Sequence, residues 1–159
     1  MTQLAKSAQS VQDALASKGL ECKVVEFPAS TRTAVEAAAA IGCEVGQIAK
    51  SLIFKTQQSS QPVLIIASGP NRVHEKKIEA LVGETLLKAD ADFVRDITGF
   101  AIGGIPPIGH TQPISYIFID KDLLNYQTIW AAAGTPYAVF VLQSSDLAEL
   151  TGGKIVEIV

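Results

Sequence analysis

Residues 48–54 read IAKSLIF, an apolar run that a lysine interrupts at its third position, and residues 63–67 read VLIIA. Polar residues without periodicity, 57–61, separate the two runs, which predicts two strands joined by a hairpin loop. Both runs are continuously apolar, and strands of this kind are typical of a sheet covered on both faces. The hairpin therefore predicts a central sheet with further elements packed on each side of it.

Helical patterns flank this hairpin. Apolar residues recur at helical spacing over residues 4–18, and Lys18-Gly19 supplies a stop. Thr33 and Glu36 form a capping box before an alanine-rich helix that ends at Gly42. Three more helices are expected: residues 74–82, a helix begun by Asp90 or Asp92 and ended near Gly99, and a capped helix over residues 145–150.

Four additional strands are expected, at residues 22–27, 114–119, 137–142 and 155–159. Residues 123–133 fit either a helix or a turn followed by a short strand. Several strands follow one another through loops too short for a crossover, so the sheet cannot be all parallel. The chain is therefore predicted to form one mixed α/β domain over residues 1–159.

Composition narrows the class of protein. A chain of 159 residues that is 48% hydrophobic and 18% charged fits one globular domain with a sizeable core. The net charge of −3 argues against bulk affinity for nucleic acid, but leaves room for contact with one nucleic-acid end through a local basic patch. No signal peptide and no apolar stretch of ~20 residues is visible, so we expect no membrane span. Cys22 and Cys43 lack C-x-x-C spacing, and reduced, buried thiols in the cytosol are expected.

Lys50 is the first candidate for chemistry. On a strand its side chain shares a face with Leu52 and Phe54, which is a core or pocket face. Three explanations remain open, because a lysine is rarely buried without a partner. It can extend to water from the strand end, pair with a carboxylate, or line a pocket and donate to a ligand oxygen.

The second candidate is the glycine- and proline-rich loop at residues 103–110, which reads GGIPPIGH. Gly103 and Gly104 allow close approach of the main chain to a ligand, and the N–H groups of residues 104, 105 and 109 could face an oxygen. A plain turn before an edge strand is the structural alternative. The loop has no phosphate-binding fingerprint.

Weaker candidates are basic residues. His74 and His110 are too few to argue for a metal site, and His110 is either a surface-turn residue or a ligand contact. Arg72, Lys76 and Lys77 form a basic cluster, which is either a solvated helix face or a contact for a phosphodiester backbone.

In this order, these segments resemble the YbaK/ProX family of trans-acting aminoacyl-tRNA editing domains, whose domain also occurs inserted in bacterial prolyl-tRNA synthetases. The matching stretches span nearly the whole chain: residues 37–38, 47–54, Gly69, Lys77, 98–99, 103–109, Asp120 and 146–147. The resemblance implies a mixed α/β fold with a central sheet partly curled into a barrel and surrounded by helices. It also implies hydrolysis of the ester between a wrong amino acid and the terminal ribose of a tRNA, with no cofactor, metal or protein nucleophile.

The resemblance also assigns roles to residues of this chain. It makes Lys50 and Gly104 the catalytic positions: Lys50 holds the substrate end, and loop N–H groups position the carbonyl while a water, helped by the ribose hydroxyl, attacks. The substrate-binding positions it implies are Gly103, Ile105, Pro107, Ile108, Gly109 and His110. Ile108 stands where the family often carries an aromatic residue, which bears on the amino-acid pocket.

A trans-acting deacylase for a small amino acid (alanine, serine, threonine or cysteine) is therefore the favoured function. Its expected partners are the acceptor end of a mischarged tRNA and, potentially, an aminoacyl-tRNA synthetase. Two alternatives remain. One is a non-catalytic binding module for aminoacyl-tRNA or a synthetase partner. The other is an enzyme that uses Lys50 as a desolvated amine in Schiff-base chemistry.

Overall fold

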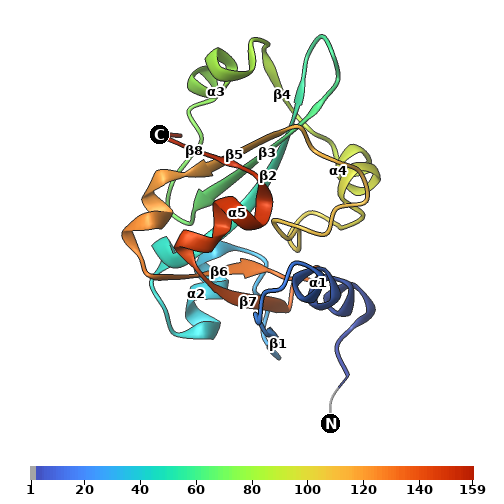
Figure 1. Cartoon of the computed structure of the whole chain (residues 1–159), viewed down its shortest axis with the longest axis vertical. Coiled ribbons are helices and arrows are strands. Elements are labelled where there is room, and N and C mark those ends of the chain that lie inside the picture. Colours follow the sequence, from blue (N-terminus) through green and yellow to red (C-terminus); the bar gives the residue numbers. More distant parts are fainter. Residues whose placement is uncertain (1–2) are drawn as a thin grey trace.

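The computed structural model describes residues 3–159 and shows, within that range, one mixed α/β domain with an eight-stranded sheet and five α-helices (Figure 1). The strands are β1 (Val24–Glu26), β2 (Ile48–Thr56), β3 (Pro62–Ser68), β4 (Leu86–Lys88), β5 (Tyr116–Asp120), β6 (Thr128–Ala132), β7 (Ala138–Gln143) and β8 (Lys154–Val156). The α-helices are α1 (Lys6–Ser17), α2 (Ala34–Ile41), α3 (Glu75–Val82), α4 (Ala91–Thr98) and α5 (Leu147–Thr151). Short 3-10 helices are η1 (Val45–Gln47), η2 (Lys121–Asn125) and η3 (Ser144–Asp146).

The predicted hairpin forms the centre of the sheet. β2 and β3 pair antiparallel from Ala49 opposite Ser68 to Lys55 opposite Pro62, and all seven residues of β3 are buried. The strand order is β1-β7-β6-β2-β3-β5-β8, and β4 also pairs with β2. The pairs β2–β6, β3–β5 and β5–β8 are parallel and the others antiparallel, which confirms the mixed sheet.

The sheet is curved, but its ladder does not close within the described residues. β1 and β8 stand at its two ends. In Figure 1, β6 and β7 run across the lower half of the molecule at a steep angle to β2 and β3. On the edge of β2 opposite β3, β6 pairs with Ile48 and Ala49, and β4 pairs with residues 54–56. Residues 50–53 therefore have no strand on that edge.

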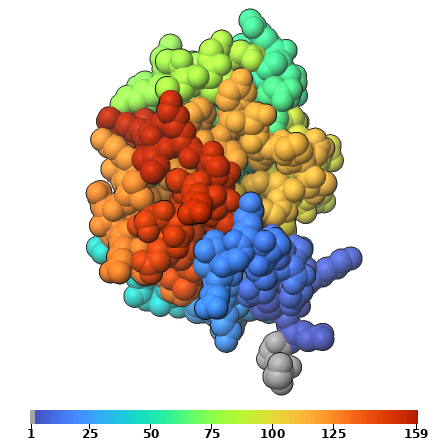
Figure 2. Space-filling model, in the orientation of Figure 1, coloured from blue at the N-terminus to red at the C-terminus, as the bar shows by residue number. Residues whose placement is uncertain are grey.

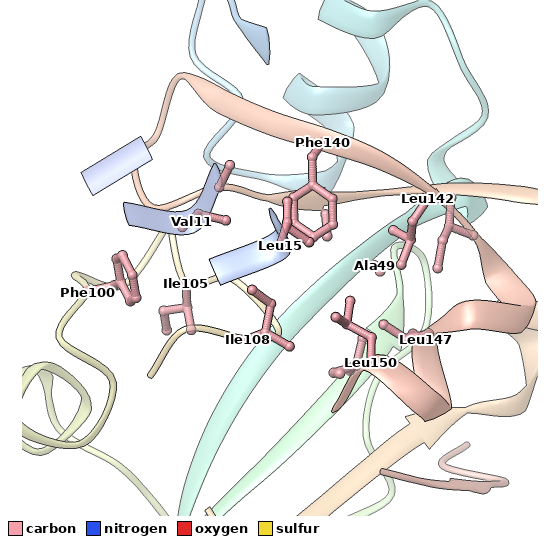
Figure 3. Close-up of a cluster of buried hydrophobic side chains, with 14 of the residues drawn as sticks. Val11, Leu15, Ala49, Phe100, Ile105, Ile108, Phe140, Leu142, Leu147 and Leu150 are labelled. Carbon is pink, nitrogen blue, oxygen red and sulfur yellow. The ribbon is translucent and has the colours of Figure 1, made fainter. Parts of the chain in front are cut away.

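The largest core cluster joins segments that are far apart in the sequence. Val11 and Leu15 of α1 meet Phe140 of β7, Leu147 of α5 and Ile108 of the glycine loop (Figure 3). Each of the five is at most 4% exposed. Figure 2 shows the consequence at the surface, where the N-terminal segment (blue) lies against the C-terminal segment (red). A smaller cluster on the other side of the hairpin includes Ile65 of β3 and Ile78 of α3.

Local signals define the helix ends. The Thr33 hydroxyl accepts the Glu36 N–H at 3.1 Å, as predicted, but donates to the Glu36 carboxylate at 2.9 Å instead of leaving that carboxylate to bind the Thr33 backbone. Asp90, not Asp92, caps α4 by accepting the Phe93 N–H at 2.8 Å. The predicted glycine stops at Gly42, Gly83 and Gly99 all have positive φ.

Four details differ from the sequence predictions or resolve them. β4 was not predicted, because a three-residue strand offers no periodicity to recognise. Residues 123–133 take the turn-and-strand alternative, as η2 and β6. The predicted capped helix at 145–150 begins instead with η3, and α5 has no side-chain cap. The final strand covers 154–156, and the first only 24–26, so both are shorter than predicted.

Cys22 and Cys43 are free and half-buried, in agreement with the prediction that no disulfide joins them. Among the described residues, the helices are too short or too polar to cross a membrane.

Candidate functional site

A cavity of about 410 Å³ lies beside the unpaired edge of β2. Its walls are residues 48–52 of β2, the start of α2 with the residues before it, part of the glycine loop, and β6 with Val139 of β7. Lys50 lines this cavity together with Ile102, Gly103 and Ile105. The two segments that the sequence singled out therefore contribute to one pocket.

Lys50 is half-buried on the wall formed by β2, and its amine donates a hydrogen bond to the Gly69 carbonyl at 3.0 Å. Within the described part of the chain no carboxylate lies within 4 Å of this amine. Burial lowers the pKa of Lys50, and the nearby Arg72 lowers it further, while Asp120 acts in the opposite direction. Of the three explanations open at the level of sequence, the pairing with a carboxylate is not found among the described residues, and Lys50 does line a pocket. Donation to a ligand oxygen stays a prediction.

The turn that supplies the Gly69 carbonyl is firmly held. The buried Asp120 carboxylate accepts hydrogen bonds from the Ser68 N–H at 3.0 Å and the Asn71 amide at 2.8 Å. The Ser68 hydroxyl donates to the Gly46 carbonyl at 2.7 Å. A Cβ on Gly69 would collide with the Val45 carbonyl, so the close approach requires glycine. These contacts fix the acceptor of the Lys50 amine and thereby orient the amine.

The first part of the glycine loop faces the cavity, and its glycines permit tight contacts. Gly103 has a φ of +101°, and a Cβ there would lie 2.7 Å from Cγ of Arg32. A Cβ on Gly104 would lie 2.9 Å from the Thr135 backbone, and the Gly104 carbonyl accepts the Gly134 N–H at 2.8 Å. Gly104 therefore anchors the loop to the turn after β6 and does not itself line the cavity.

The second part of the loop lies outside the cavity lining. Pro107 and Ile108 are buried, and Ile108 packs in the main core (Figure 3). Gly109 is exposed, and Nε2 of the His110 ring lies 2.7 Å from the Pro106 carbonyl. Burial lowers the pKa of His110. The four positions that the resemblance implied as substrate-binding here are thus separate from the pocket formed by Lys50.

The backbone N–H groups of residues 103–105 differ in whether they already have a hydrogen-bond acceptor. The Gly104 N–H donates to the Ala101 carbonyl at 3.2 Å and is already occupied. In residues 3–159 the N–H groups of Gly103 and Ile105 form no hydrogen bond. These two pocket-lining residues retain donors for a ligand.

The basic cluster does not line the cavity, although Arg72 lies near enough to Lys50 to lower its pKa. Lys77 of α3 pairs with Glu157 at 3.4 Å, and neither Arg72 nor Lys76 lines the cavity. His74 is exposed at the start of α3.

Sequence reasoning missed several residues of the pocket wall. Arg32, Val35 and Trp130 line it, as does Ser51, whose hydroxyl is the buried side-chain group left without a partner among the described residues. Arg32 stands next to a helix cap and Trp130 in a short strand, and neither position carries a local signal. Only the pairing of β2 with β6, and the packing of α2 over β2, bring them to Lys50.

Residues 28–150 match the family described as the aminoacyl-tRNA editing domain. The chain belongs to this family. The predicted resemblance is therefore confirmed. Of the residues on which it was based, Lys50, Gly103 and Ile105 line one cavity of the editing domain.

Three relatives extend this result. A solved structure of a proposed trans-editing enzyme for prolyl tRNA synthetase shares 48% sequence identity with the editing domain, with 98% of each chain covered and a TM-score of 0.92. The uncharacterized protein YwhH of Bacillus subtilis is 30% identical over 149 residues, which is 94% of each chain. The proline–tRNA ligase of Limosilactobacillus fermentum is 32% identical over 95 residues, 57% of this chain but 16% of the ligase.

Proposed function

We propose that the editing domain acts in trans to hydrolyse the ester between a small amino acid and the terminal ribose of a mischarged tRNA. The observation that carries the proposal is the shared cavity: the Lys50 amine, and the residues Gly103 and Ile105 with their unbonded N–H groups, line one space beside β2. Membership of the editing-domain family and the similarity to a proposed trans-editing enzyme support the same reaction.

The size of the cavity suits the reacting end of such a substrate. A volume of about 410 Å³ lies within the range typical of small-molecule sites, roughly 300–1,000 Å³. It accommodates an aminoacyl group with part of a ribose and leaves the rest of the tRNA outside. An acidic protein with few basic residues at the pocket is consistent with contact limited to the acceptor end.

In the proposed reaction, water attacks the ester carbonyl carbon and the bond from that carbon to the ribose oxygen breaks. The ribose oxygen takes up a proton, and the products are the free amino acid and the uncharged tRNA. The Lys50 amine uses one hydrogen on Gly69 and has two more for the substrate. The N–H groups of Gly103 and Ile105 steady the negative charge that develops on the carbonyl oxygen. The substrate's own ribose hydroxyl assists the water.

The lining disfavours positively charged side chains. Ala34, Ala37, Ala49, Ala131 and Ala132 contribute to its apolar part, and among the described residues no carboxylate does. A cationic amino-acid side chain would lose water here without gaining a partner, and Lys50 and Arg32 would repel it. An apolar pocket discriminates weakly against an added hydroxyl, so alanine, serine, threonine and cysteine form one candidate set.

The partner that the comparisons favour is a tRNA charged by a prolyl-tRNA synthetase. The proline–tRNA ligase relative carries a segment similar to this domain, and the solved relative is described as a trans-editing enzyme for that synthetase. We place the reaction in the cytoplasm, where aminoacyl-tRNA is made and where two free cysteines remain reduced.

The test is hydrolysis of a panel of mischarged tRNAs, carrying alanine, serine, threonine or cysteine, by the wild type and by Lys50→Ala. We expect turnover of one or a few esters by the wild type and a loss of about a hundredfold to a thousandfold in the variant, the range seen when one transition-state donor is removed. Lys55→Ala is the matched control, because Lys55 lies on the same strand over the Phe93 ring, outside the cavity. A folded Lys50→Ala with full activity contradicts the proposal.

Two other outcomes distinguish the alternatives. Binding of aminoacyl-tRNA without turnover of any ester supports a non-catalytic module. The lowered pKa of Lys50 in an apolar pocket is the observation that favours Schiff-base chemistry. Covalent trapping of a carbonyl compound on Lys50 by borohydride supports that reaction, and an unchanged protein mass rejects it.

A further inference from the structure

We propose that Arg32 binds the phosphate next to the terminal ribose of the substrate, and so positions the ester on Lys50. This inference rests on the proposed function and adds the chemical group by which the pocket recognises a nucleotide. Arg32 lies just before α2 and contributes to the wall of the same cavity as Lys50.

The Arg32 side chain lies beside Gly103. A Cβ on Gly103 would lie 2.7 Å from Cγ, 2.8 Å from Nε and 3.1 Å from Cδ of Arg32. The glycine therefore leaves the space that the arginine stem occupies at the cavity wall.

Within residues 3–159 the charged end of Arg32 has no partner. In residues 3–159, the ion pairs are Lys77–Glu157 and Lys121–Glu157, and the Arg32 guanidinium donates no hydrogen bond. No acidic residue lines the cavity. The chain as a whole carries a charge of −3, so a pocket with two cations and no anion is locally opposite in sign. A guanidinium fork suits the oxygens of a phosphate, which accept two parallel hydrogen bonds.

The difference in burial between the two cations suits the order of groups in an aminoacylated nucleotide. Lys50 is half-buried and bound to Gly69, whereas Arg32 is exposed. A ligand with its ester at Lys50 would have its ribose at the mouth and its phosphate at Arg32. Val35 and Ile102, 66% and 50% exposed, line the same cavity and offer apolar contacts for the sugar and base between these ends.

The experiment compares two small substrates, 2′(3′)-O-alanyl-adenosine and the same ester with a 5′-phosphate, or the matching pair for the amino acid that the tRNA panel identifies. For the wild type we expect the phosphate to lower KM roughly tenfold with little change in kcat. Arg32→Gln should remove that difference, so that KM for the phosphorylated ester rises to the value the variant shows for the phosphate-free ester. Arg32→Lys should restore part of it. On mischarged tRNA, Arg32→Gln should reduce the slope of log affinity against log salt by about one.

Arg95→Gln is the matched control, since Arg95 is an exposed arginine in the last turn of α4, away from the cavity. Equal effects of Arg32→Gln on both esters, or none on either, would overturn the inference. If the wild type hydrolyses neither ester, the mischarged-tRNA panel alone decides the proposed function, and binding of adenosine 5′-monophosphate decides the inference separately. Binding that Arg32→Gln abolishes supports the phosphate site, and equal or absent binding in both proteins rejects it.

Discussion

The two edges of β2 differ in how completely they are paired. Toward β3, every residue from Ala49 to Lys55 has a strand partner. On the opposite edge, β6 and β4 pair only with the two ends of β2, and residues 50–53 border the cavity and the glycine loop. One edge of the same strand therefore builds the core of the sheet, and the other leaves room for a ligand.

This difference shows how one strand can serve stability and binding at once. Hydrogen bonds to β3 fix the backbone of β2, so a side chain on the open edge has a rigid base. Lys50 gains its orientation from this base and from the Gly69 carbonyl. Substitutions on the β3 side should thus change stability, and substitutions on the open side should change stability, activity or both.

The largest expected effect on stability comes from a substitution in β3, which pairs with the fully bonded edge of β2. Ile65 of β3 is completely buried in the smaller core cluster. Ile65→Ala should lower the free energy of unfolding by about 2–5 kcal/mol, because it removes buried methyl groups and leaves a cavity. Urea unfolding measures this change, with Leu87→Ala on β4, where Leu87 is 42% exposed, as the control. If Ile65→Ala lowered the free energy of unfolding by less than Leu87→Ala does, the idea that the β3 side of β2 provides the stability would be contradicted.

A smaller effect on stability is expected in the glycine loop, which lies beside the unpaired edge of β2. Gly104→Ala should lower the free energy of unfolding by about 1–3 kcal/mol, since its Cβ would press on the Thr135 backbone. It should also reduce deacylation, because the displaced loop carries Gly103 and Ile105. Gly83→Ala is the control for backbone strain without crowding. Gly83 has a φ of +88°, and an added Cβ there would have nothing within 4 Å. Thermal unfolding together with activity decides the comparison, and equal activity in both variants would contradict it.

Ser51 tests the open edge itself. Its buried hydroxyl has no hydrogen-bond partner in the described residues, so Ser51→Ala should raise the free energy of unfolding by about 1 kcal/mol. Ser59→Ala should do the reverse, because the Ser59 hydroxyl bonds to the Glu84 carboxylate at 2.6 Å. Both values come from urea titrations. A destabilised Ser51→Ala would show that a bound water satisfies this hydroxyl in solution.

The smallest effect is the pH dependence that Lys50 contributes. The pKa of Lys50 is lowered on folding, chiefly by burial, so between its folded and unfolded pKa values the unfolded chain binds more protons. Stability should therefore rise with pH through that window, and the unfavourable contribution should be fully present below the folded pKa. Unfolding of the wild type and Lys50→Met from neutral to alkaline pH measures it. The wild type should gain relative to Lys50→Met, and Lys88→Met gives the background change for an exposed lysine.

The sequence predicted those features of the fold that depend on neighbouring residues. Continuous apolar runs identified β2 and β3, and glycine stops identified the ends of α2, α3 and α4. β4 was not predicted, because the conformation of three residues at the edge of a sheet depends on the partner strand and not on their own pattern. The order of strands likewise follows from pairings between distant segments, which no local signal encodes.

The candidate site was predictable only in part, for the same reason. Lys50 could be recognised in the sequence because it is a charged residue in an apolar strand. The glycine loop could be recognised by its composition. The sequence cannot show that the loop divides after Ile105, with Ile108 turned into the core and Gly103 left at the cavity. Arg32 joins the site through a contact with Gly103, far along the chain, and only the folded structure reveals that contact.

Ile105 belongs both to the main core cluster and to the wall of the cavity (Figure 3). A pocket with a wall of this kind is part of the cooperative folding unit, unlike one enclosed by a mobile flap. On heating, the pocket should persist for as long as the domain does, and the two should be lost in a single transition. For the mischarged tRNA proposed above as substrate, this arrangement keeps the pocket ready in every folded molecule.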